Sequence, residues 1–387
     1  MKEGWRYLRL GDVCEFMSGY TPSKNVLSKL GDVPYYKVSD MNAKGNESYM
    51  ISTLLYVSNP RKIFPKGSIV FPKNGGAIFT NKKRILSFDS VIDLNTEAIV
   101  PNAQYVTTDF LYKLLLDIDL SQFDNGGGLP SINIRKMQSH EVLIPPVSEQ
   151  ERLVSFLDAQ FAKIDAIKAN AEKQLQEAKA LFQNALKDLL TPKEGWEEKL
   201  LKNILLDSEN IRWQDVDKNK EYGYIDLTSV SRETKEVISP SIINSSNAPS
   251  RAKQIVKSGD LIFATTRPTL RRFCLISDVY DSQICSTGFC LLRPNKQILS
   301  SFLFYILFSD DFYFYIEPLQ TGASYPAVSD NIVKNYTIYL PSILEQEKIV
   351  EKLDELREKI TQLQSNYSQT VTLCEDLKKS LLKDIFS

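Results

Sequence analysis

Two long stretches of the chain repeat apolar residues at alternating intervals of four and three positions. They cover residues 148–190 and 344–387, and neither contains glycine or proline. A period of 3.5 residues sustained over more than four heptads is typical of coiled-coil helices. At a rise of about 1.5 Å per residue, each helix should be roughly 60 Å long. The first stripe consists of Leu153, Leu157, Gln160, Ile164, Ile167, Ala171, Gln174, Ala178, Leu181 and Ala185. The second consists of Ile349, Leu353, Leu356, Ile360, Leu363, Tyr367, Thr370, Cys374, Leu377 and Leu381.

The two stripes differ in the size of their side chains. Ala171, Ala178 and Ala185 of the first stripe stand where the second has bulkier residues. This asymmetry favours pairing of the two helices with each other over pairing of each with its own copy. One globular segment precedes the first helix and another separates the two helices. A second helix that pairs with the first must therefore run back along it, so we expect an antiparallel coiled coil.

The same motif precedes both helical stretches. Residues 142–151 read Val-Leu-Ile-Pro-Pro-Val-Ser-Glu-Gln-Glu, and residues 338–347, 196 positions later, read Ile-Tyr-Leu-Pro-Ser-Ile-Leu-Glu-Gln-Glu. Lys-Glu-Gly-Trp follows the first helix at residues 193–196, and its counterpart stands at residues 2–5. The repeat is therefore circular, and Trp5 should meet the end of the second helix as Trp196 meets the end of the first. Such a repeat predicts a pseudo-symmetric molecule with two comparable working surfaces.

The segments outside the helices combine short β-like runs with one apolar helix each. In the first segment the runs are 33–38, 68–71, 77–80 and 97–100, and the helix is 108–117. In the second they are 222–227, 260–264, 273–276 and 288–292, and the helix is 300–316. A glycine-rich loop precedes the last strand in each, at 126–132 and 322–328.

These patterns predict the α+β class, with two pseudo-symmetric α/β domains joined by two long helices that form an antiparallel coiled coil. The expected domains are residues 1–147 and 192–343. The expected helices cover residues 148–191 and 344–387.

Composition narrows the class of protein further. The chain has 387 residues, of which 43% are hydrophobic and 25% charged, and a net charge of −1. Five scattered cysteines without a CxxC pair indicate reduced thiols in a cytoplasmic protein. We expect no signal peptide, and no membrane span because the apolar run 302–316 is interrupted by Ser-Asp-Asp. The single histidine, His140, and the lack of nucleotide-binding glycine motifs speak against metal and catalytic sites, so none is assigned.

Two basic clusters stand at equivalent places in the repeat. Residues 61–84 hold seven positive charges and no negative one, and residues 251–272 hold six against the single Asp260. One such cluster alone could be a solvated charged hairpin, but two matched clusters favour nucleic acid. Lysine and arginine neutralise phosphates, while asparagine and arginine in loops can read base edges. Exposed amides of the glycine-rich loops suit a contact with the DNA backbone.

The candidate DNA-binding residues combine these clusters with the loops. They are Lys73, Asn74, Lys82, Lys83, Arg84, Arg135, Arg251, Lys253, Arg267, Arg271, Arg272, Ser324 and Tyr325. Asn74 and Arg267 are expected to read bases. Lys82, Lys83, Arg271 and Arg272 are expected to contact phosphates.

Taken together, the chain resembles the specificity subunit of a type I restriction-modification system. The matching features are Pro-Pro and Pro-Ser before Glu-Gln-Glu-Arg-Leu-Val and Glu-Gln-Glu-Lys-Ile-Val, the glycine-rich loops, and the Gly-Trp openings at Trp5 and Trp196. They span essentially the whole chain, and Pro341-Ser342 in place of Pro-Pro is a small departure. The resemblance implies that each globular domain is a target recognition domain for one half of a bipartite DNA site. It implies that the helices set the gap between half-sites and dock two modification subunits.

The resemblance also implies that the chain is not catalytic alone. Modification subunits would hold S-adenosylmethionine and methylate an adenine, and restriction subunits would use ATP and Mg²⁺, so no cofactor is expected on this chain. The expected partners are double-stranded DNA, two modification subunits and restriction subunits. An alternative from another class is a non-catalytic coiled-coil scaffold that bridges two protein-binding modules without DNA. The matched basic clusters favour the first interpretation.

Overall fold

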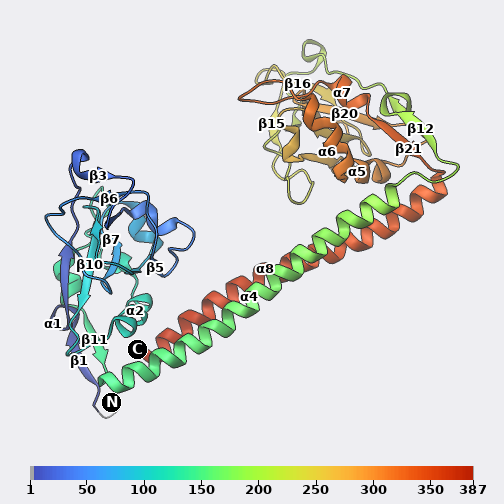
Figure 1. The fold of residues 1–387 in the computed structure, drawn as a ribbon. Helices are drawn as coiled ribbons and strands as arrows, with labels where there is room; N and C mark the ends of the chain where they lie inside the picture. Colours follow the sequence, from blue (N-terminus) through green and yellow to red (C-terminus); the bar gives the residue numbers. More distant parts are fainter. Residues whose placement is uncertain (1–3, 387) are drawn as a thin grey trace. The chain divides into compact units, whose positions relative to one another are not determined.

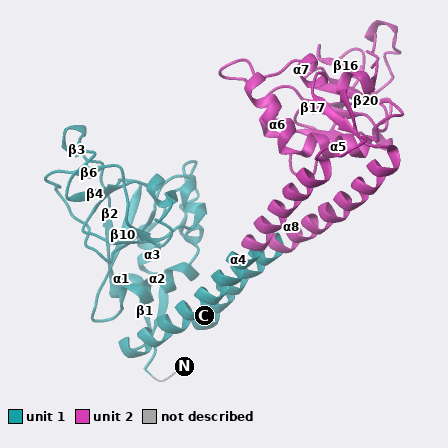
Figure 2. Cartoon of the chain, turned by 45° about the vertical axis from the view of Figure 1, so that its right-hand side comes forward, with its two compact units in different colours: residues 1–171, 368–387 teal, residues 172–367 magenta. Residues whose placement is uncertain are grey.

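Two long helices, α4 (Val147–Leu190) and α8 (Ile343–Phe386), dominate the computed structural model, which describes residues 4–386. Each has 44 residues, and the two pack antiparallel as expected (Figure 1). The chain divides into two units (Figure 2). Unit 1 consists of Met1–Ala171 and Ser368–Ser387, and unit 2 of Glu172–Tyr367, so each unit holds one globular domain and a part of both helices.

Ion pairs within unit 1 show the direction of the helix pairing. Lys378 of α8 lies 2.5 Å from the carboxylate of Asp165 on α4. Lys168, further along α4, lies 4.0 Å from Glu375, which precedes Lys378 on α8. The residue number therefore increases along α4 as that of the facing residue on α8 decreases, so the two helices are antiparallel.

Three apolar residues assigned to the helix seam lie outside it, as does Gln174 of the first stripe. Ile167, Leu181 and Leu377 have exposed fractions of 54%, 66% and 49%. The next residue is covered in all three cases, since Phe182 is buried and Lys168 and Lys378 are half-buried. An α-helix has 3.6 residues per turn and drifts by about 20° per heptad against a 3.5-residue stripe, so a strict stripe rotates away from the contact. The other assigned residues are buried (Leu153, Leu157, Ile164, Ile349, Leu353) or half-buried (Leu356, Ile360, Leu363, Leu381).

The globular domain of unit 1 contains two sheets. One has the strand order β2-β10-β7-β8-β5, formed by Cys14–Ser18, Thr96–Pro101, Ile69–Pro72, Arg84–Leu86 and Tyr49–Met50. The other has the order β3-β6-β4-β9, formed by Leu27–Ser28, Tyr56–Val57, Val33–Tyr36 and Val91–Ile92. Short helices are α1 (Leu10–Val13), α2 (Thr108–Asp117) and α3 (Ile134–Gln138).

Alternation along the strands of unit 1 places their side chains in two cores. On β7, Ile69 and Phe71 belong to the core that contains α2 and the helix residues Leu157 and Phe386. Val70, between them, belongs to the core of the second sheet. Because successive side chains of a strand point to opposite faces, the large sheet is covered by helices on one face and by the second sheet on the other.

The globular domain of unit 2 also contains two sheets, but each of them has four strands. Its sheets have the orders β13-β20-β17-β18 and β15-β14-β19-β16. The first is formed by Leu205–Leu206, Phe289–Pro294, Leu261–Ala264 and Phe273–Leu275. The second is formed by Ser241–Ile243, Tyr222–Ile225, Ile284–Ser286 and Ala252–Ile255. The helices of its domain are α5 (Ser300–Phe308), α6 (Asp310–Ile316) and α7 (Asp330–Lys334).

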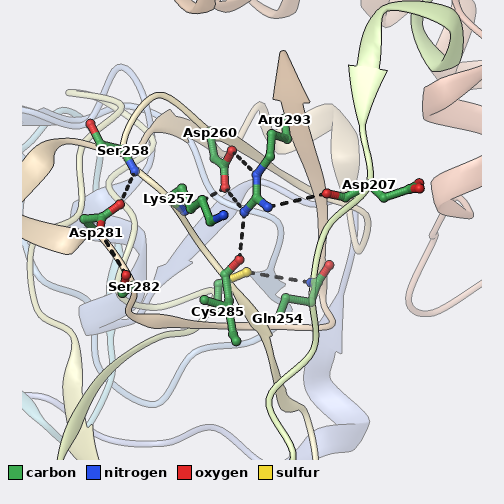
Figure 3. Close-up of polar contacts among 10 residues, drawn as sticks. Asp207, Gln254, Lys257, Ser258, Asp260, Asp281, Ser282, Cys285 and Arg293 are labelled. Carbon is green, nitrogen blue, oxygen red and sulfur yellow. Dashed lines mark hydrogen bonds and ion pairs between the residues drawn. The ribbon is translucent and has the colours of Figure 1, made fainter. Parts of the chain in front are cut away.

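A buried ion pair ties the strands of unit 2 together (Figure 3). The guanidinium of Arg293 on β20 donates to both carboxylate oxygens of Asp260, at 2.9 and 2.8 Å. It also donates to the backbone carbonyls of Ile255 and Asp207, at 3.1 and 3.4 Å. One side chain thus joins β20 to the start of β17, to β16 and to the loop after β13. Because both charges are paired and hydrogen-bonded, these interactions offset the cost of removing the charges from water.

Two of the predicted elements need correction. Residues 77–80 form part of a 3₁₀ helix, Gly76–Thr80, and not a strand. Gly75 before it and Asn81 after it both have positive φ, 76° and 52°, which ends the extended conformation on either side. The single helix expected at 300–316 is two helices that meet at Ser309, whose hydroxyl accepts a hydrogen bond from the Phe312 amide as an N-cap.

A common joint attaches each globular domain to its helices. A two-stranded sheet stands at the joint in both units, β1 (Arg6–Arg9) with β11 (Glu141–Ile144) and β12 (Glu197–Leu200) with β21 (Thr337–Leu340). Trp5 belongs to the same apolar core as Leu382 and Phe386 at the end of α8. Trp196 packs against the core that includes the end of α4. Residues 2 and 3 of the first Lys-Glu-Gly-Trp lie outside the described residues.

Within the joint, the glutamine of each Glu-Gln-Glu motif is fully buried. Gln150 Oε1 accepts from the Thr107 amide (2.9 Å), and its Nε2 donates to the carbonyls of Tyr105 (2.7 Å) and Pro145 (2.9 Å).

Gln346 makes the same three contacts in unit 2. Its Oε1 accepts from the Leu299 amide (2.8 Å), and its Nε2 donates to the carbonyls of Gln297 and Pro341 (2.9 Å each). The repeated motif is therefore an anchor between helix and domain.

Among residues 4–386, no helix combines the length and apolarity that crossing a membrane requires.

Candidate nucleic-acid interface

In unit 1 the loop after β7 lies against the glycine-rich loop. The Gly75 amide donates to the Pro130 carbonyl at 2.8 Å, and the Ile132 amide donates to the Lys73 carbonyl at 2.9 Å. Asn74 and Ser131 form an isolated β-bridge between them. The structure thus brings part of the first basic cluster together with the glycine-rich loop. We call residues 73–76 and 126–131 the first paired-loop surface.

Unit 2 has the same pairing at the equivalent place. The Arg267 amide donates to the Pro326 carbonyl at 2.6 Å, and the Val328 amide donates to the Thr265 carbonyl at 2.9 Å. Arg267 stands in the position of Gly75, and both have positive φ, 50° and 76°. Residues 265–268 and 322–327 form the second paired-loop surface. Two surfaces of the same construction therefore lie at matching places in the repeat.

The polar side chains of the first surface are held by hydrogen bonds. The ammonium of Lys73 lies 3.1 Å from Glu97, which is only 2% exposed. Asn74 Nδ2 donates to Asn95 Oδ1 at 3.3 Å. Lys82, which follows this surface in the basic cluster, donates to the side chain of Asn42. The charge of Lys73 is thus already paired, whereas Asn74 and Lys82 are half-buried and make their hydrogen bonds at the exposed surface.

Lys83 requires a correction to the predicted phosphate contacts. Its side chain is buried, with an exposed fraction of 1%. The ammonium donates to the side chain of Asn81 (2.7 Å) and to the carbonyl of Ile118 (2.5 Å). Burial lowers its pKa to about 7. A group that is enclosed in this way is structural, so we leave Lys83 out of the interface.

The guanidinium of Arg84 is also used in hydrogen bonds within the domain. It is half-buried and donates to the carbonyls of Lys83 (2.7 Å) and Met41 (3.2 Å). Burial lowers the pKa of its guanidinium. Arg135, in contrast, is exposed on α3, directly after the glycine-rich loop. It is therefore better placed for a phosphate than Arg84.

An arginine–tyrosine stack marks the second surface. The guanidinium of Arg267 lies 4.8 Å from the ring centroid of Tyr325, and its Nη2 is 3.4 Å from the carbonyl of Ser324. Arg267, Ser324 and Tyr325 are all exposed. Beside the stack is a hollow of about 250 Å³, lined by Leu227, Ala264, Thr266, Arg267, Leu270, Arg272 and Tyr325. An apolar floor with cationic and aromatic walls can receive the edge of a base.

The remaining basic residues of unit 2 differ in whether their charge is already paired within the chain. Arg271 forms an ion pair with Asp310 at 2.5 Å and lies 4.2 Å from the ring centroid of Tyr313. Arg251 is exposed, and its carbonyl accepts from Thr287, next to Gly288, whose carbonyl accepts from Thr265. This chain of backbone contacts places Arg251 near the second surface.

Lys253 is exposed on β16. Within residues 4–386, no hydrogen bond or ion pair of the Lys253 side chain links it to the second surface, so its place there stays a prediction.

The turn between β9 and β10 was missed in the sequence. It contains Asp93 and Asn95, and the Lys73 amide donates to the Asn95 carbonyl at 2.8 Å. The turn therefore borders the first paired-loop surface directly. Its sequence signal is the Asp-Leu-Asn tripeptide between two strands, which by itself is typical of an ordinary turn.

Comparison with known proteins finds one family across most of the chain. A family described as "Type I restriction modification DNA specificity domain" matches residues 2–177 and again 193–373. The specificity subunit of the type I restriction enzyme MjaVIII of Methanocaldococcus jannaschii is 22% identical, over 91% of this chain and 85% of that protein. The StySPI specificity subunit of Salmonella potsdam is 21% identical, over 100% of this chain and 89% of that protein.

Solved structures share the fold. A chain from work on complex assembly and conformational transition of the type I R-M system aligns with a TM-score of 0.77 and 18% identity, covering 99% of this chain and 97% of that chain. The HsdS subunit from Thermoanaerobacter tengcongensis aligns with a TM-score of 0.55 and 18% identity, covering 99% and 96%. Two α/β domains with two long antiparallel helices are thus a known architecture.

Proposed function

Because this chain belongs to the family of type I restriction-modification specificity subunits, we propose that each of its two globular domains reads one half of a bipartite DNA site. The specificity subunit is the non-catalytic component of such an enzyme and gives it its DNA specificity. The proposed recognition domains are residues 1–147 and 192–343. The proposed spacer consists of residues 148–191 and 344–387.

One observation carries this proposal, namely that both domains present a paired-loop surface of the same construction. Each surface joins a loop from the central sheet to a glycine-rich loop through backbone hydrogen bonds. The backbone arrangement is equivalent, but the side chains differ, because unit 2 has Thr266 in the position of Asn74 and Arg267 in the position of Gly75. Such a pair of surfaces suits two half-sites of different sequence, because base edges are read by side chains.

We assign the basic residues that reach the surface to the DNA backbone. Lys82 and Arg135 in unit 1 and Arg251 and Lys253 in unit 2 would neutralise phosphates. Of these, Lys82 is half-buried and the others are exposed. Arg272, which lines the hollow beside Arg267, would contact the DNA close to the reading position. Arg271 would contribute less, because Asp310 already pairs with it.

The spacer helices would also dock two modification subunits. In unit 1, Ile167, Leu373 and Leu377 are exposed apolar residues on α4 and α8. In unit 2, Leu181 of α4 is likewise exposed. Apolar side chains that are not covered within the chain support a contact with a partner protein. The modification subunits would hold S-adenosylmethionine, and restriction subunits would add ATP-dependent cleavage.

The scaffold alternative is disfavoured by the family itself. Its domain, described as a DNA specificity domain, matches the chain twice, once over each globular domain and the helix that follows. A scaffold that only bridges proteins would not require this domain.

The test is to reconstitute the chain with its modification subunits and to profile methylation across random-sequence DNA. Arg267→Ala should relax base preference at one position of one half-site, by a free energy of about 1–3 kcal/mol. Arg267→Lys should relax it similarly, because lysine lacks the planar fork that stacks on Tyr325. Lys82→Ala should instead weaken binding evenly across sequences and reduce the salt slope by about one.

Variants of Lys73 and Asn74, which lie on the first paired-loop surface, serve as the comparison for the other half-site. Any specificity that they change should map to the half-site that Arg267 variants leave intact. If variants of both surfaces alter the same half-site, the assignment of one domain to one half-site is wrong.

A further inference from the structure

The side-chain amide of Asn74 lies on the first paired-loop surface and is only partly used by the protein itself. Its Nδ2 donates one hydrogen bond, to Asn95 Oδ1 at 3.3 Å. Within the described part of the chain, no other hydrogen bond of this amide is found, so one N–H and the carbonyl oxygen remain available. A donor and an acceptor side by side on one amide are what an external partner could use.

The orientation of this amide is fixed by a second one. Asn95 donates through both its backbone amide and its Nδ2 to Asp93 Oδ1, at 3.0 Å each. A carboxylate only accepts hydrogen bonds, so Asn95 must turn its Nδ2 toward Asp93 and its Oδ1 away from it. That oxygen faces Asn74, which must therefore present its own Nδ2 to it. The orientation of Asn74 follows from the charge on Asp93 through two amides.

Asp93 is well suited to hold this role. Its other oxygen, Oδ2, accepts from the hydroxyls of Tyr35 (2.7 Å) and Thr21 (3.0 Å). Partial burial alone would raise the pKa of Asp93, but the hydrogen bonds from Asn95, Tyr35 and Thr21 outweigh it and lower the pKa. Asp93 is therefore a carboxylate at neutral pH.

The backbone on both sides of Asn74 is also immobilised. The Lys73 amide donates to the Asn95 carbonyl at 2.8 Å, and the Gly75 amide donates to the Pro130 carbonyl at 2.8 Å. Lys73 is further held by the buried Glu97. Side-chain orientation and backbone position are thus both set before any ligand arrives, which reduces the entropy cost of binding.

We propose that Asn74 reads an adenine in the half-site of unit 1, and that Asn95 and Asp93 are positioning residues that set its orientation. The major-groove edge of adenine offers the N6 donor and the N7 acceptor, which the carbonyl oxygen and N–H of an asparagine match in a bidentate pair. Guanine offers two acceptors on that edge, and cytosine offers a donor alone. This inference rests on the proposed function and adds the base that one domain selects.

The experiment compares Asn74→Ala and Asn95→Ala in the complex with modification subunits, by methylation profiling on random-sequence DNA. Both changes should reduce the preference for adenine at one and the same position, by about tenfold or more for Asn74→Ala. Asn95→Ala removes the acceptor that holds Asn74, so it should relax that position without changing overall affinity for DNA. The half-site read by unit 2 should not change.

Two control variants separate orientation from folding. Tyr35→Phe removes one hydrogen bond from Asp93 but leaves both bonds to Asn95, so the adenine preference should persist. Asn102→Ala makes the same chemical change at the other end of β10 and should leave the profile as in the wild type. A thermal melt of each variant checks that its fold is retained, since a folding defect would lower methylation at all sites.

Three results would overturn the inference. If Asn74→Ala relaxes preference for a base other than adenine, the assignment of the base is wrong. If Asn95→Ala is folded and keeps the full preference, the orienting role is wrong. If the wild-type complex shows no sequence preference at all, the proposed function fails, and the inference fails with it.

Discussion

At the scale of residues, burial decides which predicted charges can meet a ligand. The sequence shows seven positive charges in residues 61–84 but not that Lys83 is enclosed, Lys73 paired and Arg84 half-buried. Asn74 and Arg267 were expected to read bases from loops, and the structure places both in loops, Asn74 half-buried and Arg267 exposed, while the reading of bases stays a prediction. Asp93 and Asn95 could not be found, because their role depends on which loop lies beside their turn.

The enclosed Lys83 predicts a pH dependence of stability. Burial lowers the pKa of its ammonium from 10.5 to about 7, although Asp119 and Asp117 oppose the shift. Between these values the unfolded chain binds more protons than the folded chain, so the free energy of unfolding rises as the pH increases. Lys83→Met should remove this contribution. Urea titrations at about pH 7 and about pH 9 should show the wild type gaining stability relative to the variant. A difference that does not change with pH would contradict the prediction.

At the scale of elements, the heptad pattern predicted two helices to within a few residues but placed part of the seam on the wrong side. The error is greatest where the stripe includes Gln174 and Leu181, while Leu175 and Phe182, one position on, are buried. In each of the pairs Gln174/Leu175 and Leu181/Phe182, the second residue has the larger apolar side chain, and this difference could have identified the buried position. The prediction instead kept a strict spacing of 3.5 residues, although a straight α-helix has 3.6 residues per turn.

The seam is tested by two isoleucines three positions apart on α4. Ile164 is buried and Ile167 is exposed. Ile164→Asp places a charge in an apolar contact and should lower the free energy of unfolding by about 3 kcal/mol or more. Ile167→Asp should change it by no more than about 0.5 kcal/mol. Denaturant titration compares the two, and Ile360→Asp on α8 should behave like Ile164→Asp, though less strongly because Ile360 is half-buried. Equal effects at Ile164 and Ile167 would refute the corrected seam.

The buried glutamines give the second prediction at this scale. Gln150→Ala would leave the Thr107 amide and the carbonyls of Tyr105 and Pro145 without a partner in the protein interior. Each buried unsatisfied group costs about 1–3 kcal/mol, so the loss should reach at least about 2 kcal/mol. Gln346→Ala should cost a similar amount in unit 2. Gln174→Ala, an exposed glutamine on α4, is the matched control and should be nearly neutral. Chemical denaturation would reject the anchor if all three variants had equal stability.

At the scale of the whole chain, the repeat was the most reliable guide. An offset of 196 residues relates the Glu-Gln-Glu motifs and the glycine-rich loops, and the structure has equivalent joints and paired loops at those places. The repeat does not extend to the details of each domain. Unit 1 has a five-stranded sheet where unit 2 has a four-stranded one. Differences of this kind arise in loops and edge strands, where no periodic pattern constrains the sequence.

The glutamine anchors have a consequence for how such a protein can evolve. The hydrogen bonds of each glutamine side chain go to main-chain atoms, and these are present whatever the side chains around them. The same glutamine can therefore form these hydrogen bonds with a domain of unrelated sequence, provided that the backbone of that domain follows the same path at the joint. Recombination between genes could then transfer an entire domain in one event. The recipient would acquire a new preference intact, without passing through inactive intermediates produced by successive point mutations.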